Sequence, residues 1–305
     1  MDTPNERSLH SWPVPRTGGL ALLAGMIAGG ACLVVIGAPL VAGHVVLDLG
    51  GLEAPLSGLA VLAGVSFLDD RCDLRVAWRL VVQLGVAAVL VNAIWPWGGG
   101  HLGWWLFGIP FLVWMLNLYN FMDGMDGLAG GMAVFGFGTL ATLAWQQQAL
   151  AEAFLCSLVV GAALGFLTQN LPPARLFMGD TGSTLLGVLA GVAILWFHQR
   201  GILPLWLGGL LFSPFIVDAT VTLARRVLRG ERFWEAHRSH YYQRLVRSGW
   251  GHGRTLFAEA LLMVALALSV LWAARLPAPA QWSIIAAWAV AYLGMMAWID
   301  KRTSA

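Results

Sequence analysis

The chain has 305 residues, of which 58% are hydrophobic and 11% are charged, and its mean hydropathy is +0.72. Soluble domains are usually about 45 to 50% apolar, so this composition excludes a soluble protein and predicts one that crosses a membrane several times. The net charge of +2 indicates no class of partner, and we expect no nucleic-acid ligand. The three cysteines lie far apart without a CxxC pair, which argues against a disulfide framework and a zinc site.

The N-terminal segment MDTPNERSLHSWPVPRTGG is polar and lacks the basic region of a cleavable signal peptide. After it, apolar segments recur along the whole chain with short polar breaks. Because a bilayer core of ~30 Å needs about 20 helical residues, the sequence predicts one all-α polytopic membrane domain over 1–305. About ten transmembrane helices are expected, at 18–42, 55–69, 76–95, 103–120, 124–145, 149–169, 182–199, 202–226, 255–274 and 280–299, with a cytoplasmic loop at 227–254.

The basic residues test this parsing, because lysine and arginine concentrate in the cytoplasmic loops of membrane proteins. With the N-terminus inside, only Arg200 and Arg275 of the eighteen basic residues fall outside. The segments that carry acids, amides and histidines then all lie on the cytoplasmic side. We therefore expect the chemistry of the protein to face the cytoplasm.

The segment FLDDRCDLR ends a short apolar span with Asp69 and Asp70. Carboxylates beside hydrocarbon are costly unless they are paired or bound to a cation, so these acids indicate a functional site. An equally open alternative is an interfacial helix end whose acids meet Arg71 and Arg75 in water.

The segment NLYNFMDGMDGLAGG places four polar side chains, Asn117, Asn120, Asp123 and Asp126, at the end of an apolar helix. The spacing of the first three predicts that they stack along one helix face and offer oxygen atoms to a common space. The glycines between them let the backbone turn closely around a ligand. An interhelical hydrogen-bond cluster is the alternative, but four such residues without a basic partner favour a ligand site.

The segment RLFMGDTGSTLLG places Asp180 just before another apolar span. Asp180, Thr181 and Ser183 are each candidates for the N-cap of that helix. The same helix N-terminus favours an anion such as phosphate, and the two roles are compatible.

The stretch 225–254 holds eight arginines, a pattern typical of topology signals or of binding to anionic lipids. HRSHYYQR within it differs, because His237, Arg238 and His240 fall together and arginine binds phosphate oxygens in a bidentate way. Acids and a basic segment at one membrane surface suggest a divalent cation with a phosphorylated substrate, as in Mg²⁺ sites. The chain has no GxxxxGK(S/T) loop, which argues against an ATPase.

Five segments, taken in order, resemble the polyprenyl-phosphate N-acetylhexosamine-1-phosphate transferases of glycosyltransferase family 4: DTPNERSLHSWPVPRTGG, FLDDRCDLR, NLYNFMDGMDGL, FMGDTGS and HRSHYYQRL. The resemblance implies transfer of a sugar 1-phosphate from a UDP-N-acetylhexosamine to undecaprenyl phosphate, with release of UMP. It implies Mg²⁺, or alternatively Mn²⁺, as the cofactor. It also implies a multi-pass protein of the bacterial inner membrane with its active site toward the cytoplasm, and it leaves a homodimer open.

The resemblance assigns roles to the acids and amides by position. Asp180 looks like the principal metal ligand, with Asn120 as a second ligand. Asp69 and Asp70 look like the acidic pair that positions the lipid phosphate. Whether this pair also removes a proton stays open, because a phosphate monoester with a second pKa of ≈ 6 is mostly dianionic at pH 7.

The remaining roles concern the nucleotide and the diphosphate. The resemblance implies a nucleotide pocket lined by Asp123 and Asp126, with Phe177 beside the uracil and Asn117 as a further substrate-binding residue. The diphosphate or the sugar would then contact His237, Arg238 and His240.

Two departures from the family pattern carry expectations. Relatives usually have one more span before the first motif, so we expect either a start further upstream or a chain without that helix. Some relatives have a lysine near position 77, and here Arg79 is expected to supply that charge.

The loop HRSHYYQRLVRSGWGH looks closer to enzymes that initiate O-antigen or related lipopolysaccharide glycans than to the peptidoglycan translocase. This favours a UDP-N-acetylhexosamine donor, including 6-deoxy sugars such as FucNAc or QuiNAc, with sugar choice in residues 229–254. The alternatives are the phospho-MurNAc-pentapeptide translocase and, from another class, a cation-coupled transporter. A transporter should bury its acids near mid-span, whereas the acids of the motifs fall at the cytoplasmic ends of spans. Asp218, within the span 202–226, is the exception and has no assigned role.

Overall fold

The computed structural model describes residues 13–40, 53–72, 74–231 and 237–303. Within these ranges the chain is helical with short connections and contains no β-strand. The helices are α1 (Gly18–Leu40), α2 (Glu53–Cys72), α3 (Val76–Ile94), α4 (Leu102–Met122), α5 (Leu128–Gln146), α6 (Leu150–Asn170), α7 (Gly179–Gln199), α8 (Leu205–Leu211), α9 (Ser213–Leu228), α10 (Tyr241–Leu245), a π-helical turn (Val246–Trp250), α11 (Gly251–Ala273) and α12 (Ala278–Thr303).

The predicted all-α polytopic membrane fold is confirmed. Seven of the described helices are long and apolar enough to cross a membrane, and the bent pair of α8 and α9 adds an eighth if it forms one span. Each of the ten predicted spans overlaps a helix of the structure. The first two, α1 and α2, lie outside the set of seven, since the end of α2 carries charged residues and the described apolar part of α1 is short.

The predicted span 202–226 is two helices that meet at an angle of 82°. Pro214 stands in the first turn of α9, where its missing N–H removes no helical hydrogen bond, so a new helix can begin there. The predicted loop 227–254 also contains more structure than expected, because α10 and the π-helical turn lead directly into α11.

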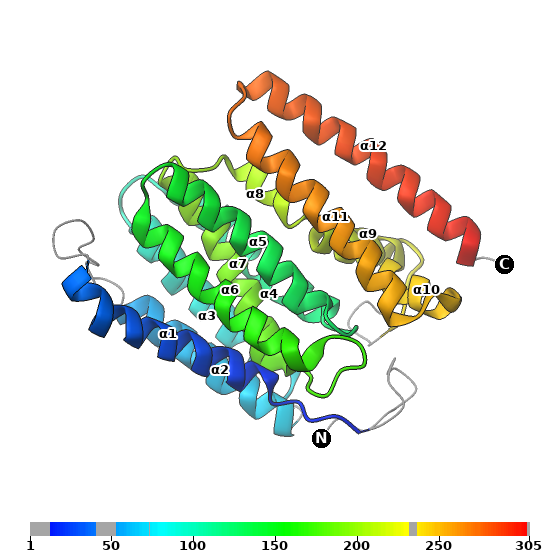
Figure 1. Cartoon of the computed structure of the whole chain (residues 1–305), viewed down its shortest axis with the longest axis horizontal. Coiled ribbons are helices and arrows are strands. Elements are labelled where there is room, and N and C mark those ends of the chain that lie inside the picture. The colour runs from blue at the N-terminus through cyan, green and yellow to red at the C-terminus, as the bar shows by residue number, and fades with distance from the viewer. Residues whose placement is uncertain (1–12, 41–52, 73, 232–236, 304–305) are drawn as a thin grey trace.

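Helix α7 lies at the centre of the bundle and packs against α1, α2, α3, α4 and α5. Its close approach to α4 depends on Gly187, where a Cβ would lie 2.7 Å from the Met115 carbonyl oxygen. In Figure 1, α1 and α2 lie along one edge of the bundle and α11 and α12 along the opposite edge. Helices α7 and α4 are thus closely packed, and their neighbouring ends carry Asp180 and Asn120.

Those motifs gather at one end of the bundle, which we call the polar end: the end where α1, α3, α5, α7 and α11 begin and α2, α4, α6, α9 and α12 finish (Figure 1). Among the described cations, only Arg200 and Arg275 lie at the other end. Residues 1–12 of the first motif and Asp73 lie outside the described residues.

Candidate active site

The first described residues of the chain attach to the start of α7. The Phe177 N–H donates to the Pro15 carbonyl oxygen at 2.8 Å, and the Gly18 N–H donates to the Phe177 carbonyl oxygen at 2.9 Å. This short pairing places Arg16 and Phe177 at the polar end, beside the acids of α2 and α7. The predicted position of Phe177 next to a uracil ring stays a prediction.

Asp70, at the end of α2, caps the start of α7. Its carboxylate accepts hydrogen bonds from the Asp180 N–H at 2.9 Å, the Thr181 N–H at 3.0 Å and the Thr181 hydroxyl at 2.7 Å. The prediction that Asp180, Thr181 or Ser183 caps this helix is wrong, because α7 begins earlier, at Gly179, and the cap comes from another helix. Asp70 therefore joins α2 to α7 and fixes the backbone on which Asp180 stands.

Asp69 is buried and pairs with Arg79 of α3. The Arg79 Nη1 atom lies 2.5 Å from Asp69 Oδ2 and 3.6 Å from Asp180 Oδ2, and the Leu74 N–H donates to Asp69 Oδ1 at 2.8 Å. The alternative in which Asp69 and Asp70 meet only Arg71 and Arg75 in water therefore fails. Arg79 instead links the two carboxylates of neighbouring motifs.

Asn120, in the last turn of α4, reaches across to α7. Its Nδ2 atom donates to Asp180 Oδ1 at 3.0 Å and to Ser183 Oγ at 2.9 Å. The Asp180 side chain keeps 33% of its surface exposed. The two predicted metal ligands are thus in contact, and the carboxylate is open to a ligand on one side.

Asp123 follows directly after α4 and has no hydrogen bond to its carboxylate within the described part of the chain. Burial raises its pKa well above the usual 3.8, and the nearby carboxylates of Asp180 and Asp70 raise it further, while Arg16 acts in the opposite direction. This site therefore has more negative charge than its own side chains neutralise.

Asn117 and Asp126 point to other partners. Asn117 donates to Gln83 Oε1 of α3 at 2.9 Å, one turn deeper in the bundle than Asn120. Asp126 accepts a hydrogen bond from the Ala174 N–H at 3.0 Å and lies 3.0 Å from His252 Nδ1. Substrate contacts for these two residues stay predictions, and in the structure they join helices and loops around the site.

The segment 237–242 packs against the end of α4. His240 is buried, and its ring stacks on Phe121 with ring centres 6.2 Å apart and lies 4.9 Å from the His237 ring. The Tyr242 hydroxyl donates to the Phe121 carbonyl oxygen at 3.1 Å. The structure therefore brings the predicted histidines next to the helix end that carries Asn120, with half-buried Arg238 between them in sequence.

His237 is neutral in this environment. Burial lowers its pKa to about 4, with further lowering from His240 and Arg226, and only Asp218 acts in the opposite direction. The Ser239 hydroxyl lies 2.8 Å from His237 Nδ1 and orients the ring. At pH 7 this side chain can therefore offer a polar nitrogen without adding charge.

The acid cluster, defined here as Asn120, Asp123 and Asp180, fits a hard divalent cation. No group of three or more His, Cys, Asp or Glu side chains suited to a metal occurs among the described residues. This donor set excludes a closed zinc-type site but agrees with Mg²⁺, which takes one or two carboxylates and keeps waters and substrate phosphates as its other ligands.

Several residues at this end were not predicted as site residues. Arg16 acts electrostatically on Asp123, Thr181 and Ser183 bond to Asp70 and Asn120, and Asp218 contacts His240. Arg16 belongs to the PVPRTGG segment of the first motif, so the sequence could have indicated it as a site residue. The role of Asp218 depends on a tertiary contact that no local pattern reveals.

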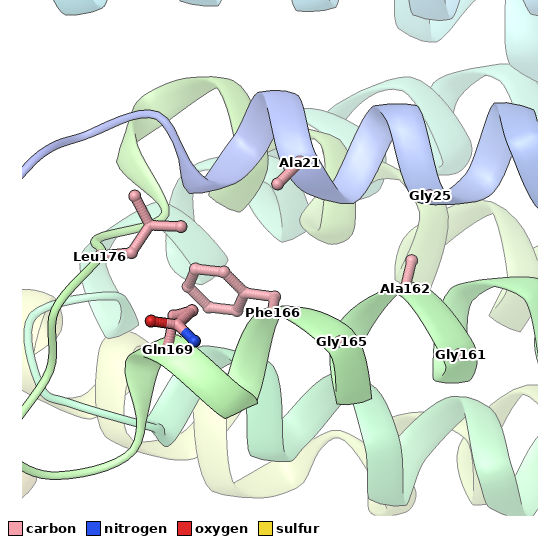
Figure 2. Close-up of a pocket in the computed structure, with 8 residues that line it drawn as sticks. All are labelled: Ala21, Gly25, Gly161, Ala162, Gly165, Phe166, Gln169 and Leu176. Carbon is pink, nitrogen blue, oxygen red and sulfur yellow. The ribbon is translucent and has the colours of Figure 1, made fainter.

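A separate cavity of about 240 Å³ lies between α1 and α6 (Figure 2). Its lining is apolar apart from one amide and carries no charge: Ala21, Gly25, Gly161, Ala162, Gly165, Phe166, Gln169 and Leu176. It offers nothing to hold a diphosphate, so the acid cluster is the better candidate site.

Comparison with known proteins supports this choice. Residues 53–198 match glycosyl transferase family 4. The probable undecaprenyl-phosphate N-acetylglucosaminyl 1-phosphate transferase of Bacillus subtilis (strain 168) is 29% identical over 298 residues, which cover 89% of this chain and 76% of that protein. The undecaprenyl-phosphate alpha-N-acetylglucosaminyl 1-phosphate transferase of Yersinia pestis is 28% identical over 315 residues, which cover 96% and 82%.

A different relative is more similar over a shorter region. The phospho-N-acetylmuramoyl-pentapeptide-transferase of Levilactobacillus brevis is 36% identical over 178 residues, which cover 57% of this chain and 54% of that protein. Of these three proteins, the two aligned over more than four fifths of the chain are thus the N-acetylglucosaminyl 1-phosphate transferases.

Proposed function

The chain belongs to the polyprenyl-phosphate N-acetylhexosamine-1-phosphate transferases, and from this premise we propose that it transfers an N-acetylhexosamine 1-phosphate from a UDP-sugar to undecaprenyl phosphate. The observation that carries the proposal is the junction of α4 and α7. There the partly exposed carboxylate of Asp180 lies 3.6 Å from Arg79, Asp123 follows the end of α4, and the His240 ring stacks on Phe121 of the same helix end. Such a site combines a place for a cation with cationic and neutral donors for phosphate oxygens.

The bonds that change follow from the products. A phosphate oxygen of the lipid attacks the β-phosphorus of the UDP-sugar, and a new P–O–P bond forms. The bond from the β-phosphorus to the bridging oxygen breaks, and UMP leaves with that oxygen. Such transfers are catalysed mainly by positioning and charge neutralisation.

Magnesium is the proposed cofactor, held by Asp180 and Asn120 with Asp123 nearby. When bound, Mg²⁺ would neutralise the charge of the diphosphate. The excess negative charge around Asp123 supports this assignment.

Asp69 and Asp70 act through other residues. Both oxygens of Asp69 already accept hydrogen bonds, from Leu74 and Arg79, and Asp70 is occupied by the start of α7. Because the lipid phosphate is mostly dianionic at pH 7, no base is needed to activate it. Asp69 holds Arg79 ready for the lipid phosphate, and Asp70 sets the position of Asp180.

In this proposal the protein lies in the bacterial inner membrane, with its polar end on the cytoplasmic side. The concentration of described cations at that end supports the orientation, because positive residues are retained on the cytoplasmic side. A UDP-sugar is a cytoplasmic metabolite, and the lipid phosphate reaches the same surface from the bilayer.

The donor is a UDP-N-acetylhexosamine, and the product starts O-antigen or a related cell-envelope glycan. Similarity to N-acetylglucosaminyl 1-phosphate transferases over 89% and 96% of the chain supports this donor over UDP-MurNAc-pentapeptide, for which the match covers 57% of the chain. Residues 229–254 are the proposed region of sugar choice.

A donor panel tests the proposal. Purified protein with undecaprenyl phosphate and Mg²⁺ is given UDP-GlcNAc, UDP-FucNAc, UDP-QuiNAc and UDP-MurNAc-pentapeptide, and UMP is measured. We expect UMP from at least one of the first three donors and none without the lipid. UMP from the pentapeptide donor alone would favour the peptidoglycan translocase, and no UMP from any donor would contradict the proposal.

A further inference from the structure

Asp218 is a buried carboxylate of α9 that the proposed chemistry does not use directly. It is 6% exposed and accepts four hydrogen bonds. Three reach Oδ1: from Thr222 Oγ1 at 3.1 Å, from His240 Nδ1 at 3.1 Å and from the Tyr241 N–H at 3.0 Å. The fourth reaches Oδ2 from the Tyr242 N–H at 3.1 Å.

The contact with His240 determines which ring nitrogen carries a proton. An ionised carboxylate only accepts hydrogen bonds, so His240 Nδ1 must be the donor. In the neutral imidazole this leaves Nε2 as a bare acceptor nitrogen. The rings of Phe121, Tyr242 and His237 lie around the imidazole, and the Gln243 N–H also points to the His240 side chain in the capping box of α10.

The same carboxylate holds the start of α10. This helix has five residues, too few to be stable alone in water. Its first N–H groups donate to Asp218, and the N–H of His240 donates to Gln243 Oε1 at 3.3 Å. The position of the His240 backbone thus depends on an acid from α9.

The start of α10, which Asp218 holds, contacts the end of α4. Tyr242 bonds to the Phe121 carbonyl oxygen, and the His240 ring stacks on Phe121, the residue after Asn120. A displacement of α10 would therefore move His240 relative to Asn120.

We propose that Asp218 is a positioning residue that fixes His240 in its Nδ1–H form and holds it beside the Asn120 end of α4, leaving Nε2 for the substrate. This inference rests on the proposed transferase function. It gives a role to the acid of the predicted span 202–226 that the sequence motifs did not explain.

A double-mutant cycle on turnover tests the proposal. Asp218→Asn is expected to lower kcat by about 10- to 100-fold, the usual cost of losing an orienting carboxylate, with the KM for the UDP-sugar changed less than about twofold. In a His240→Ala background, the same change is expected to cost less than about threefold, because the residue to be positioned is gone. Thr222→Val is the matched control: it removes a donor to the same oxygen and should leave kcat within about twofold.

The His240 tautomer provides a measurement on the unmodified protein. In protein labelled with ¹⁵N-histidine, with the His240 signals assigned by their loss in His240→Ala, the proposal predicts a protonated Nδ1. A His240 with its proton on Nε2 alone would overturn the proposal, as would an Asp218→Asn cost that is equally large with and without His240. An unmodified protein that releases no UMP from any donor would instead refute the transferase function, and the tautomer would still test the contact.

Discussion

The junction of α4 with α7 and the junction of α9 with α10 both bring carboxylates to the polar end, but they satisfy them differently. Asp218, at the second junction, accepts four hydrogen bonds from its own protein. Asp123, at the first, has no carboxylate hydrogen bond within the described residues, and its pKa is raised mainly by burial. Asp180 lies between these extremes, with Asn120 on one oxygen and Arg79 at 3.6 Å from the other.

This difference separates acids that build the fold from acids that bind a ligand. A buried charge is stable only if donors or opposite charges compensate it. At Asp218 the protein's own donors compensate the buried charge, so this carboxylate positions the residues that bond to it. At the acid cluster the compensation is incomplete, and a cation with a diphosphate can supply it.

The largest expected effect is at the acid cluster. Asp180→Ala should lower Mg²⁺-dependent UMP release by about a thousandfold or more, because the proposed Mg²⁺, which would neutralise charge in the transition state, loses its carboxylate ligand. Asp300→Asn is a control at the same end, where Asp300 pairs with Arg225 and Arg244 away from the cluster. The control should keep most activity, and a fully active Asp180→Ala protein would remove Asp180 from the site.

His240→Ala should have the next largest effect. Loss of a positioned imidazole is expected to reduce kcat by about a hundredfold, with membrane insertion unchanged, as measured by steady-state UMP release. Unaltered kinetics would mean that the α10 segment lies outside the active site.

Asp70→Ala should lower stability, which Asp180→Ala leaves intact because it keeps the cap of α7, and it should also loosen the backbone that carries Asp180. Loss of a helix cap costs about 0.5 to 2 kcal/mol, so the variant should unfold at a lower temperature in detergent even without substrate. The measurement is a thermal melt of both variants, and a melting temperature equal to that of the unmodified protein would contradict the capping role.

Asp123→Asn should have the smallest effect, and it should raise stability, whereas Asp70→Ala lowers it. Because the pKa of Asp123 is raised in the folded protein, the folded state binds its proton more tightly, and stability is lost as pH rises from about 4 through that raised pKa. The neutral variant lacks this loss. Without Mg²⁺ its melting temperature should exceed that of the unmodified protein by a margin that grows from pH 5 to pH 8, and saturating Mg²⁺ should remove the margin. A margin independent of pH would contradict the assignment of excess charge to Asp123.

Hydropathy and charge predicted the helical membrane fold and the gathering of the motifs at one end, because these properties are local to each segment. The contact of Asn120 with Asp180 agrees with the family resemblance, which implied that both are metal ligands. The cap that Asp70 places on α7 and the hold of Asp218 on His240 did not follow, because each joins residues far apart in sequence. The bend between α8 and α9 was missed because the apolar pattern continues across it.

The path of the β-phosphate tests the central claim most directly. UDP-N-acetylglucosamine, or whichever donor the panel selects, is labelled with ³²P at the β-phosphate and incubated with the protein, Mg²⁺ and undecaprenyl phosphate. A sugar-1-phosphate transferase must place the label in the lipid product and release unlabelled UMP. Label recovered in UDP, with an unlabelled glycolipid, would show transfer of the sugar alone and would contradict the account.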